Sequence, residues 1–160
     1  MDLRTQKNKN VSSDEYFTPW ELFSLLGQFD TDPCTSKNRP FDTAKIHYTR
    51  EEDGLAKEWK GVVWLNPPYS SSLLNAFVKR LSEHGNGMAL LVSRIDNLLF
   101  QETICPHATS MYVLRKRVKF IAPDGQRKSP MFGSLLIAFG EECDRRLRDL
   151  AVEGKYIKLN

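Results

Sequence analysis

The pattern of apolar and polar positions divides the chain into short apolar segments separated by polar turns. Residues 61–65 and 88–92 are apolar at almost every position, which is typical of parallel strands covered on both faces of a sheet. Further strands are predicted at 29–34, 44–49, 110–114, 118–121 and 135–139.

Helical patterns lie between these strands. Thr18 is expected to cap the first helix, with Pro19 in its first turn and Gly27 at its end. One of the serines at 70–72 is expected to begin a second helix, which buries Leu74, Phe77, Val78 and Leu81. Helices are also predicted over 96–104 and 141–150.

This order of elements predicts an α/β fold. The sheet is expected to be mostly parallel, with 118–121 and 135–139 as an antiparallel strand pair near the C-terminus. Ligands bind such sheets beyond the carboxyl ends of the strands. Two predicted strands end there in polar loops, Asp32-Pro33-Cys34 and Asn66-Pro67-Pro68-Tyr69, so these loops are the first candidates for a binding site.

Length and composition limit the organisation of the chain. Its 160 residues, 41% hydrophobic and 27% charged, correspond to one globular domain. We expect a flexible basic arm at 1–13 and a single domain at 14–160. The sequence has neither a membrane-spanning apolar run nor an export signal, so a cytoplasmic location and no membrane partner are expected.

The three cysteines, Cys34, Cys105 and Cys143, lie far apart in the sequence. They form neither a Cys-x-x-Cys motif nor a cluster with histidine. We therefore predict reduced thiols and no metal site.

The net charge of +3 is unevenly distributed. Residues 101–140 hold six basic and two acidic side chains. Such a basic stretch suits a polyanion such as DNA, although a solvated surface would explain it equally well.

The Asn66-Pro67-Pro68-Tyr69 loop has a distinctive chemistry. Two prolines remove two N–H donors but keep their carbonyls, and the Asn66 amide adds another acceptor oxygen. The Asn66 oxygen and the Pro67 carbonyl could hold both hydrogens of a planar NH2 group and free its lone pair to attack a methyl sulfonium. Tyr69 would stack on the substrate, which contributes about 1–3 kcal/mol per base. A plain proline turn at a strand end is the alternative.

Several segments, taken in order, resemble amino-methyltransferases of the class I fold and, more narrowly, the phage Dam-type DNA N6-adenine methyltransferase family. The resemblance covers about residues 14–139. The segments that carry it are Tyr16-Phe17-Thr18-Pro19, 29–34, Asp53-Gly54-Leu55, 63–70, Arg117-Val118-Lys119-Phe120 and 129–134. This chain differs from both groups after the first strand. Class I enzymes have a glycine-rich turn there, and the narrower family has small alanines. Cys34 and Thr35 stand there in this chain.

The resemblance implies a Rossmann-like class I methyltransferase sheet, S-adenosylmethionine as the cofactor and methyl transfer to N6 of a flipped adenine in DNA. The implied catalytic residues are Asn66, Pro67, Pro68 and Tyr69. Implied cofactor contacts are Thr18, Pro19, Asp32, Pro33, Cys34, Asp53 and Asn66. Implied DNA contacts are Ser70, Arg115, Arg117, Lys119, Phe120, Arg127, Lys128 and Ser129.

Other functions are compatible with the same residues. A planar amide in a protein glutamine, or an amino group in RNA, presents the same NH2 group, and a non-catalytic DNA-binding module could share the fold. Asp53 could instead cap a helix, and Phe120 could belong to the core. The sequence is compatible with a monomer or a homodimer.

Overall fold

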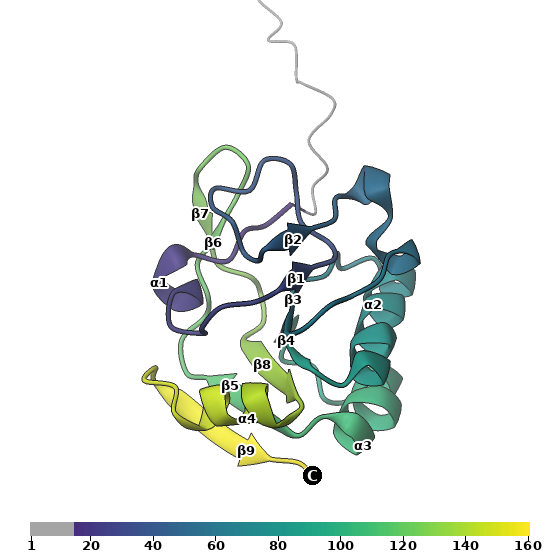
Figure 1. Ribbon diagram of the computed structural model, residues 1–160. Helices are drawn as coiled ribbons and strands as arrows, with labels where there is room; N and C mark the ends of the chain where they lie inside the picture. The colour runs from purple at the N-terminus through teal and green to yellow at the C-terminus, as the bar shows by residue number, and fades with distance from the viewer. Residues whose placement is uncertain (1–14) are drawn as a thin grey trace, which may run out of the picture.

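A computed structural model describes residues 15–160. The basic arm predicted at 1–13 lies outside these residues. A seven-stranded sheet with the strand order β2-β1-β3-β4-β8-β5-β9 forms the centre of the molecule (Figure 1). Its strands are β1 Thr31–Asp32, β2 Ile46–His47, β3 Val63–Leu65, β4 Gly87–Val92, β5 Ser110–Leu114, β8 Ser134–Phe139 and β9 Gly154–Lys158. A separate antiparallel ribbon joins β6 Phe120–Ile121 to β7 Arg127–Lys128.

The sheet is mixed. The pairs β2–β1, β1–β3 and β3–β4 are parallel, whereas β4–β8, β8–β5 and β5–β9 are antiparallel. Five strands therefore share one direction, and β8 and β9 run against them. The predicted α/β fold is confirmed, and most strands point the same way even though half of the pairs are antiparallel.

One predicted strand pairing is wrong. Residues 118–121 were expected to pair with 135–139, but β8 lies between β4 and β5, and β6 pairs with β7. All six positions of β8 are buried, and only a central place in the sheet covers both faces of such a strand. The sequence prediction also missed β9, a mostly exposed edge strand without an apolar run.

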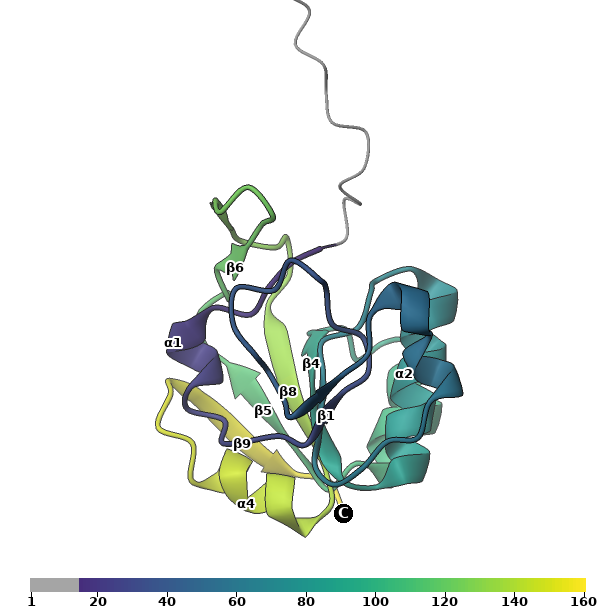
Figure 2. The ribbon, with the colours of Figure 1, turned by 45° about the horizontal axis from the view of Figure 1, so that its top comes forward.

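Helices cover both faces of the sheet (Figure 2). The helical segments are α1 Trp20–Phe23, the 3-10 turns η1 Arg50–Glu52 and η2 Gly54–Ala56, α2 Ser71–His84, the π-helix η3 Leu99–Ile104, α3 Cys105–His107 and α4 Glu141–Arg148. Among residues 15–160, none of the helices has the length and apolar character needed to cross a membrane.

The first helix differs from its prediction at both ends. Its N-cap is Pro19 rather than Thr18, and it ends at Phe23, well before Gly27. Thr18 is buried, and its hydroxyl accepts a hydrogen bond from Asn66 instead of capping the helix. The second helix follows its prediction closely, with Ser70 as N-cap and Phe77, Val78 and Leu81 buried.

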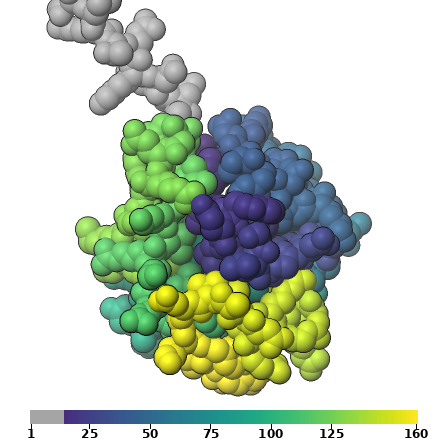
Figure 3. All heavy atoms as spheres, turned by 90° about the vertical axis from the view of Figure 1, so that its left-hand side faces the viewer, coloured from purple at the N-terminus to yellow at the C-terminus, as the bar shows by residue number. Residues whose placement is uncertain are grey.

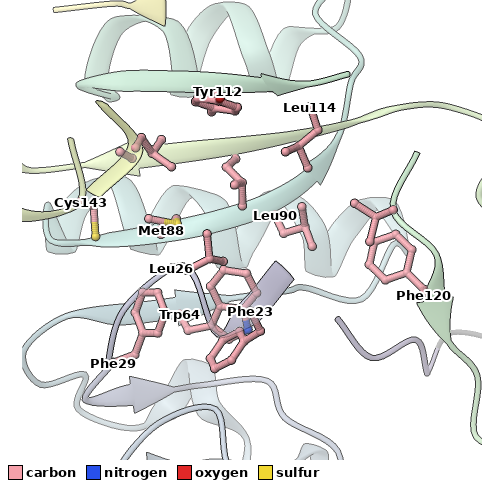
Figure 4. Packing of buried hydrophobic residues seen from close by; sticks show 14 residues of the cluster. Phe23, Leu26, Phe29, Trp64, Met88, Leu90, Tyr112, Leu114, Phe120 and Cys143 are labelled. Atoms are coloured by element: carbon pink, nitrogen blue, oxygen red, sulfur yellow. The ribbon is translucent and has the colours of Figure 1, made fainter. Parts of the chain in front are cut away.

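The core consists of one apolar cluster on each face of the sheet. On one face, Phe23, Phe29 and Trp64 pack ring against ring, with centroids 5.1–5.8 Å apart, and the cluster continues to Cys143 of α4 (Figure 4). On the other face, α2 and η3 cover the alternate side chains of the same strands. This two-sided burial fixes the strand ends that carry the candidate site.

Candidate active site

A pocket of about 560 Å³ lies at the carboxyl ends of β1 and β3. This volume is within the range of about 300–1,000 Å³ that is usual for small-molecule sites. Its walls come from four segments: residues 15–18, residues from Asp32 to Thr43, residues from Thr49 to Leu55, and residues from Trp64 to Phe77. At the same edge of the molecule, the β6–β7 hairpin (green) and the 35–55 segment (blue) rise on either side of α1 (Figure 3).

The side-chain amide of Asn66 has a defined orientation. Its Nδ2 atom donates to the backbone carbonyl of Tyr16 at 3.1 Å and to Oγ1 of Thr18 at 3.4 Å. A carbonyl can only accept, so Nδ2 and not Oδ1 must face Tyr16. Within residues 15–160 the Oδ1 atom has no hydrogen-bond donor, which leaves an acceptor at the pocket wall.

The rest of the loop adds acceptors and a flat ring. Pro67 is buried, Pro68 is half-buried, and both line the pocket. Tyr69 lines it too, yet 36% of its surface is exposed, so its ring is accessible to a ligand. Desolvation raises the pKa of Tyr69 to about 12, and its phenol therefore stays neutral at physiological pH.

Asp32 supplies a buried carboxylate to the same pocket. Its Oδ1 accepts a hydrogen bond from the Cys34 amide at 3.2 Å, and its Oδ2 accepts one from the Thr43 hydroxyl. Burial raises the pKa of Asp32 to about 6, against the lowering effect of these two bonds. A ligand that brings hydroxyl donors or positive charge would satisfy this carboxylate.

The two candidate loops are linked to each other. The thiol of Cys34 donates to the backbone carbonyl of Asn66, with 3.4 Å between Sγ and O. Burial raises the pKa of this thiol well above its ordinary value, so Cys34 remains a protonated donor and is not a reactive thiolate. Its position supports contact with a ligand in the pocket.

His47 anchors the segment that carries Thr43. The Nε2 atom of His47 accepts the backbone amides of Thr43 at 3.1 Å and Ala44 at 3.2 Å, which requires Nε2 to be unprotonated. Burial lowers the pKa of His47 and favours this neutral form. His47 and Thr43 were not among the predicted site residues, because neither belongs to a recognised motif, although His47 lies in the predicted strand 44–49.

Gly54 allows the pocket wall formed by Thr49 to Leu55 to pack closely against the turn that follows Asp32. A Cβ atom on Gly54 would lie 1.8 Å from the carbonyl oxygen of Pro33, so only glycine fits this approach. The Trp59 indole donates to the Gly54 carbonyl at 2.8 Å and fixes it further. Asp53, at φ 52°, precedes this contact and lines the pocket; its side chain makes no capping hydrogen bond.

The pocket gathers many, but not all, of the predicted site residues. Thr18, Asp32, Cys34, Asp53, Asn66, Pro67, Pro68, Tyr69 and Ser70 line it. Pro19 and Pro33 are buried beside it and are not among its lining residues. The pocket residues that the site prediction did not include are, among others, Tyr16, Arg39, Phe41, Thr43 and Arg50; of these five, only Tyr16 belonged to a recognised segment.

The predicted DNA contacts other than Ser70 lie outside the pocket. Phe120 is 6% exposed and belongs to the core cluster, so the structure favours the core alternative over stacking on a base. Arg127 pairs with Glu21 at 2.5 Å, and Arg115 lies 3.9 Å from Glu153. Arg117, Lys119, Lys128 and Ser129, which are also exposed, lie around the hairpin.

Metal-binding side chains are not clustered in the described part of the chain. Within residues 15–160, no group of three or more His, Cys, Asp or Glu side chains could hold a metal ion. The polar groups of the pocket are instead carboxylate, amide, hydroxyl, thiol and guanidinium groups arranged around an apolar wall.

Comparison with known proteins adds one match. The family described as DNA N-6-adenine-methyltransferase (Dam) matches residues 5–147, which include all four walls of the pocket. No curated protein and no solved structure matches the chain significantly. The family expected from the sequence is thereby confirmed.

Proposed function

The chain belongs to the Dam family of DNA N-6-adenine methyltransferases, and from this premise we propose that it transfers a methyl group from S-adenosylmethionine to N6 of adenine in DNA. One observation carries the proposal. The Asn66–Tyr69 loop and the buried Asp32 carboxylate face a single pocket, with Oδ1 of Asn66 left as an acceptor. Such a pocket suits an amino group and a cofactor side by side.

The residues of the pocket fit this cofactor. Its volume of about 560 Å³ is adequate, and a buried carboxylate suits the hydroxyl and ammonium groups of S-adenosylmethionine. Asp32, Asp53, Cys34 and Thr18 would hold it, with Thr43 orienting Asp32. The cofactor supplies an electrophilic methyl group on a sulfonium.

The catalytic loop would act by positioning. Oδ1 of Asn66 and the Pro67 carbonyl would accept the two amino hydrogens of adenine and draw its lone pair out of conjugation with the ring. Tyr69 would stack on the base. The nitrogen loses its proton after methylation, so no side chain is needed as an obligatory base, and orientation and electrostatics supply most of the catalysis.

Access to the amino group requires adenine to leave the base stack, which costs a few kcal/mol. The exposed ring of Tyr69 and the cations around the hairpin, Arg117 and Lys128, suit an extruded base and its phosphates.

The strand order, with β8 antiparallel between β4 and β5, agrees with a Rossmann-like class I methyltransferase sheet. We assign residues 14–160 to one catalytic domain acting on DNA in the bacterial or phage-infected cytoplasm.

Methyl transfer can be tested directly. Wild type, Asn66→Ala and the control Asn75→Ala, an exposed residue of α2, are incubated with methyl-labelled S-adenosylmethionine and, in parallel, unmethylated DNA, RNA and glutamine-containing peptides. We expect label on adenine N6 in DNA, lost only in Asn66→Ala. Label on RNA or peptide alone would mean that the substrate is RNA or protein and not DNA. If calorimetry detects no cofactor binding by the wild type, the enzyme proposal fails in favour of a non-catalytic DNA-binding module.

A further inference from the structure

Two loops at the same edge of the sheet as the pocket expose large apolar side chains. One loop follows β4 and comprises residues 93–98, and the other precedes β8 and comprises residues 129–133. They lie side by side, as the hydrogen bond from the Ser93 amide to the Gly133 carbonyl at 2.9 Å shows. Four side chains on these loops form what we call the apolar rim, with exposed fractions of 55%, 70%, 78% and 47% for Ile95, Leu98, Met131 and Phe132, respectively.

The apolar rim lies at the same edge of the sheet as the candidate catalytic loop. Strands β3 and β4 are parallel neighbours, and Leu65, the last residue of β3, pairs with Ala89. Strand β4 continues to Val92, which is about 10 Å further at the usual rise per residue. The apolar rim therefore projects beyond the end of β3, at the same edge of the sheet as the pocket, and none of its four side chains lines the pocket itself.

The number and place of these side chains indicate a partner surface. Single exposed apolar residues are common, but a group of four on adjoining loops is characteristic of an interaction site. By contrast, exposed Trp20 contacts Phe41, with ring centroids 5.0 Å apart. In the described chain no further element covers the rim.

Cations flank the apolar rim. The Arg94 guanidinium lies over the Phe132 ring at 5.6 Å from its centroid. Arg117 donates to the Pro130 carbonyl at 3.3 Å, and Lys128 is exposed just before the loop. Asp96 is the acidic residue of the two loops. Apolar side chains between cations complement double-stranded DNA, which has an apolar base stack between two rows of phosphates.

We propose that Met131 and Phe132 enter the base stack of double-stranded DNA and fill the space that the target adenine leaves. Ile95 and Leu98 support them, and the flanking cations contact the phosphates. A wedge of this kind stabilises the duplex with its base extruded, so it lowers the cost of presenting adenine to Asn66. This inference rests on the proposed DNA methylation and adds to it the means of extrusion.

The kinetic test uses Met131→Ser/Phe132→Ser, Phe132→Trp and the control Ile157→Ser, which alters an exposed apolar residue on the edge strand β9. On unmethylated duplex DNA we expect the double variant to lose at least about tenfold in rate, because it no longer replaces the lost stacking. Phe132→Trp and Ile157→Ser should keep near-wild-type rates. Cofactor affinity, measured by calorimetry, should be unchanged in all three, which shows an intact pocket.

A fluorescence test reports insertion itself. The emission of Phe132→Trp, after subtraction of wild-type emission from Trp20, Trp59 and Trp64, should be quenched by duplex DNA, whereas Ile157→Trp should not respond. The wedge would be overturned if the double variant kept full activity, or if Phe132→Trp lost as much activity as the double variant. Unquenched emission from Phe132→Trp would also overturn it and would favour a protein partner for the rim. A wild type that methylates no DNA would instead overturn the proposed function.

Discussion

The side chain of Asn66 is held by the backbone of Tyr16: its Nδ2 atom lies 3.1 Å from a carbonyl oxygen fifty positions earlier in the chain. The segment before α1 thus orients the amide of a loop that follows β3. The acceptor face of Asn66 is fixed before any substrate arrives, and such preorganisation is a main source of enzymatic rate enhancement.

Substitution of this amide by a carboxylate tests the orientation. In Asn66→Asp the side chain cannot donate to the Tyr16 carbonyl, and two acceptors would face each other. We expect kcat to fall by about 100-fold, as for the loss of one preorganised catalytic hydrogen bond, with little change in cofactor affinity. Asn75→Asp, the same change on the exposed surface of α2, is the control. Equal rates for the two variants would contradict the assigned role of Asn66.

Asp32 should affect stability and binding in opposite directions. Burial raises its pKa from 3.8 to about 6, so between these values the folded protein binds a proton that the unfolded chain has lost. By linkage, the free energy of unfolding of the ligand-free protein therefore falls as pH rises from about 4 to 6. The shift corresponds to at most about 3 kcal/mol.

The substitution Asp32→Asn removes the loss of stability that comes from burying an ionised carboxylate. We expect Asp32→Asn to unfold at a higher urea concentration than wild type at pH 7 and at a similar one at pH 4. Its affinity for S-adenosylmethionine should be at least about tenfold weaker, the usual effect of losing a hydrogen bond to a charged group. Calorimetry measures the affinity, and wild-type affinity in this variant would remove Asp32 from the cofactor site.

His47 and Thr43 should act as one unit. Both hold the Asp32 carboxylate, since His47 fixes the backbone at Thr43 and the Thr43 hydroxyl donates to Asp32. We expect His47→Ala and Thr43→Val each to weaken cofactor binding by about three- to tenfold. The double variant should be scarcely weaker than either single one, because coupled residues are not additive. His107→Ala, an exposed histidine outside the pocket, is the control; fully additive losses would contradict the coupling.

Acid should weaken the same contact. Protonation of Nε2 breaks both amide bonds that His47 accepts, and the pKa of His47 is lowered from its ordinary value of 6.5. A depressed folded-state pKa means that the unfolded chain binds the proton first, so the contribution of His47 to stability falls as pH drops below about 6.5. Because Asp32 acts in the opposite direction over the same pH range, the contribution of His47 is read as the difference in urea midpoint between wild type and His47→Ala, and this difference should shrink as pH falls below about 6.5.

Gly54→Ala should disrupt the wall of the pocket. Its methyl group would collide with the Pro33 carbonyl, and the collision involves two backbones that cannot move aside cheaply. We expect a loss of about 2–4 kcal/mol in the free energy of unfolding, in the range of severe steric substitutions. Gly85→Ala is the matched control, because that residue has φ 72° but open space around it. Its expected cost is only about 1 kcal/mol, and an equal loss in both variants would contradict the close approach.

The sequence predicted best what is local. The chemistry of Asn66 to Tyr69 lies within one short string, and the buried face of α2 follows from its helical period. Neither depends on a distant partner. Strand β8 was assigned correctly as a strand but given the wrong neighbour, because an apolar run reports burial and not which strand lies beside it.

Tertiary contacts account for what was missed. Thr18 has the residue type and position of a helix cap, yet its hydroxyl bonds to Asn66. His47 and Thr43 support Asp32 from a segment without a recognised motif. Lys155 and Lys158 belong to an edge strand in which polar residues suit the exposed surface. Thr18 and Asn66 are 48 positions apart and β9 pairs with β5, whereas Thr43 lies only 11 positions from Asp32; in each case a tertiary contact decides the role of the residue.

The two prolines of the catalytic loop also determine how it can be observed. Pro67 and Pro68 have no backbone amide hydrogen, so the centre of the loop gives no signal in amide hydrogen exchange or in amide-detected NMR spectra. The Asn66 side chain, however, carries two amide hydrogens on Nδ2, which donates to Tyr16 and Thr18. Its NH2 resonance is therefore the natural spectroscopic reporter for the arrival of cofactor and DNA.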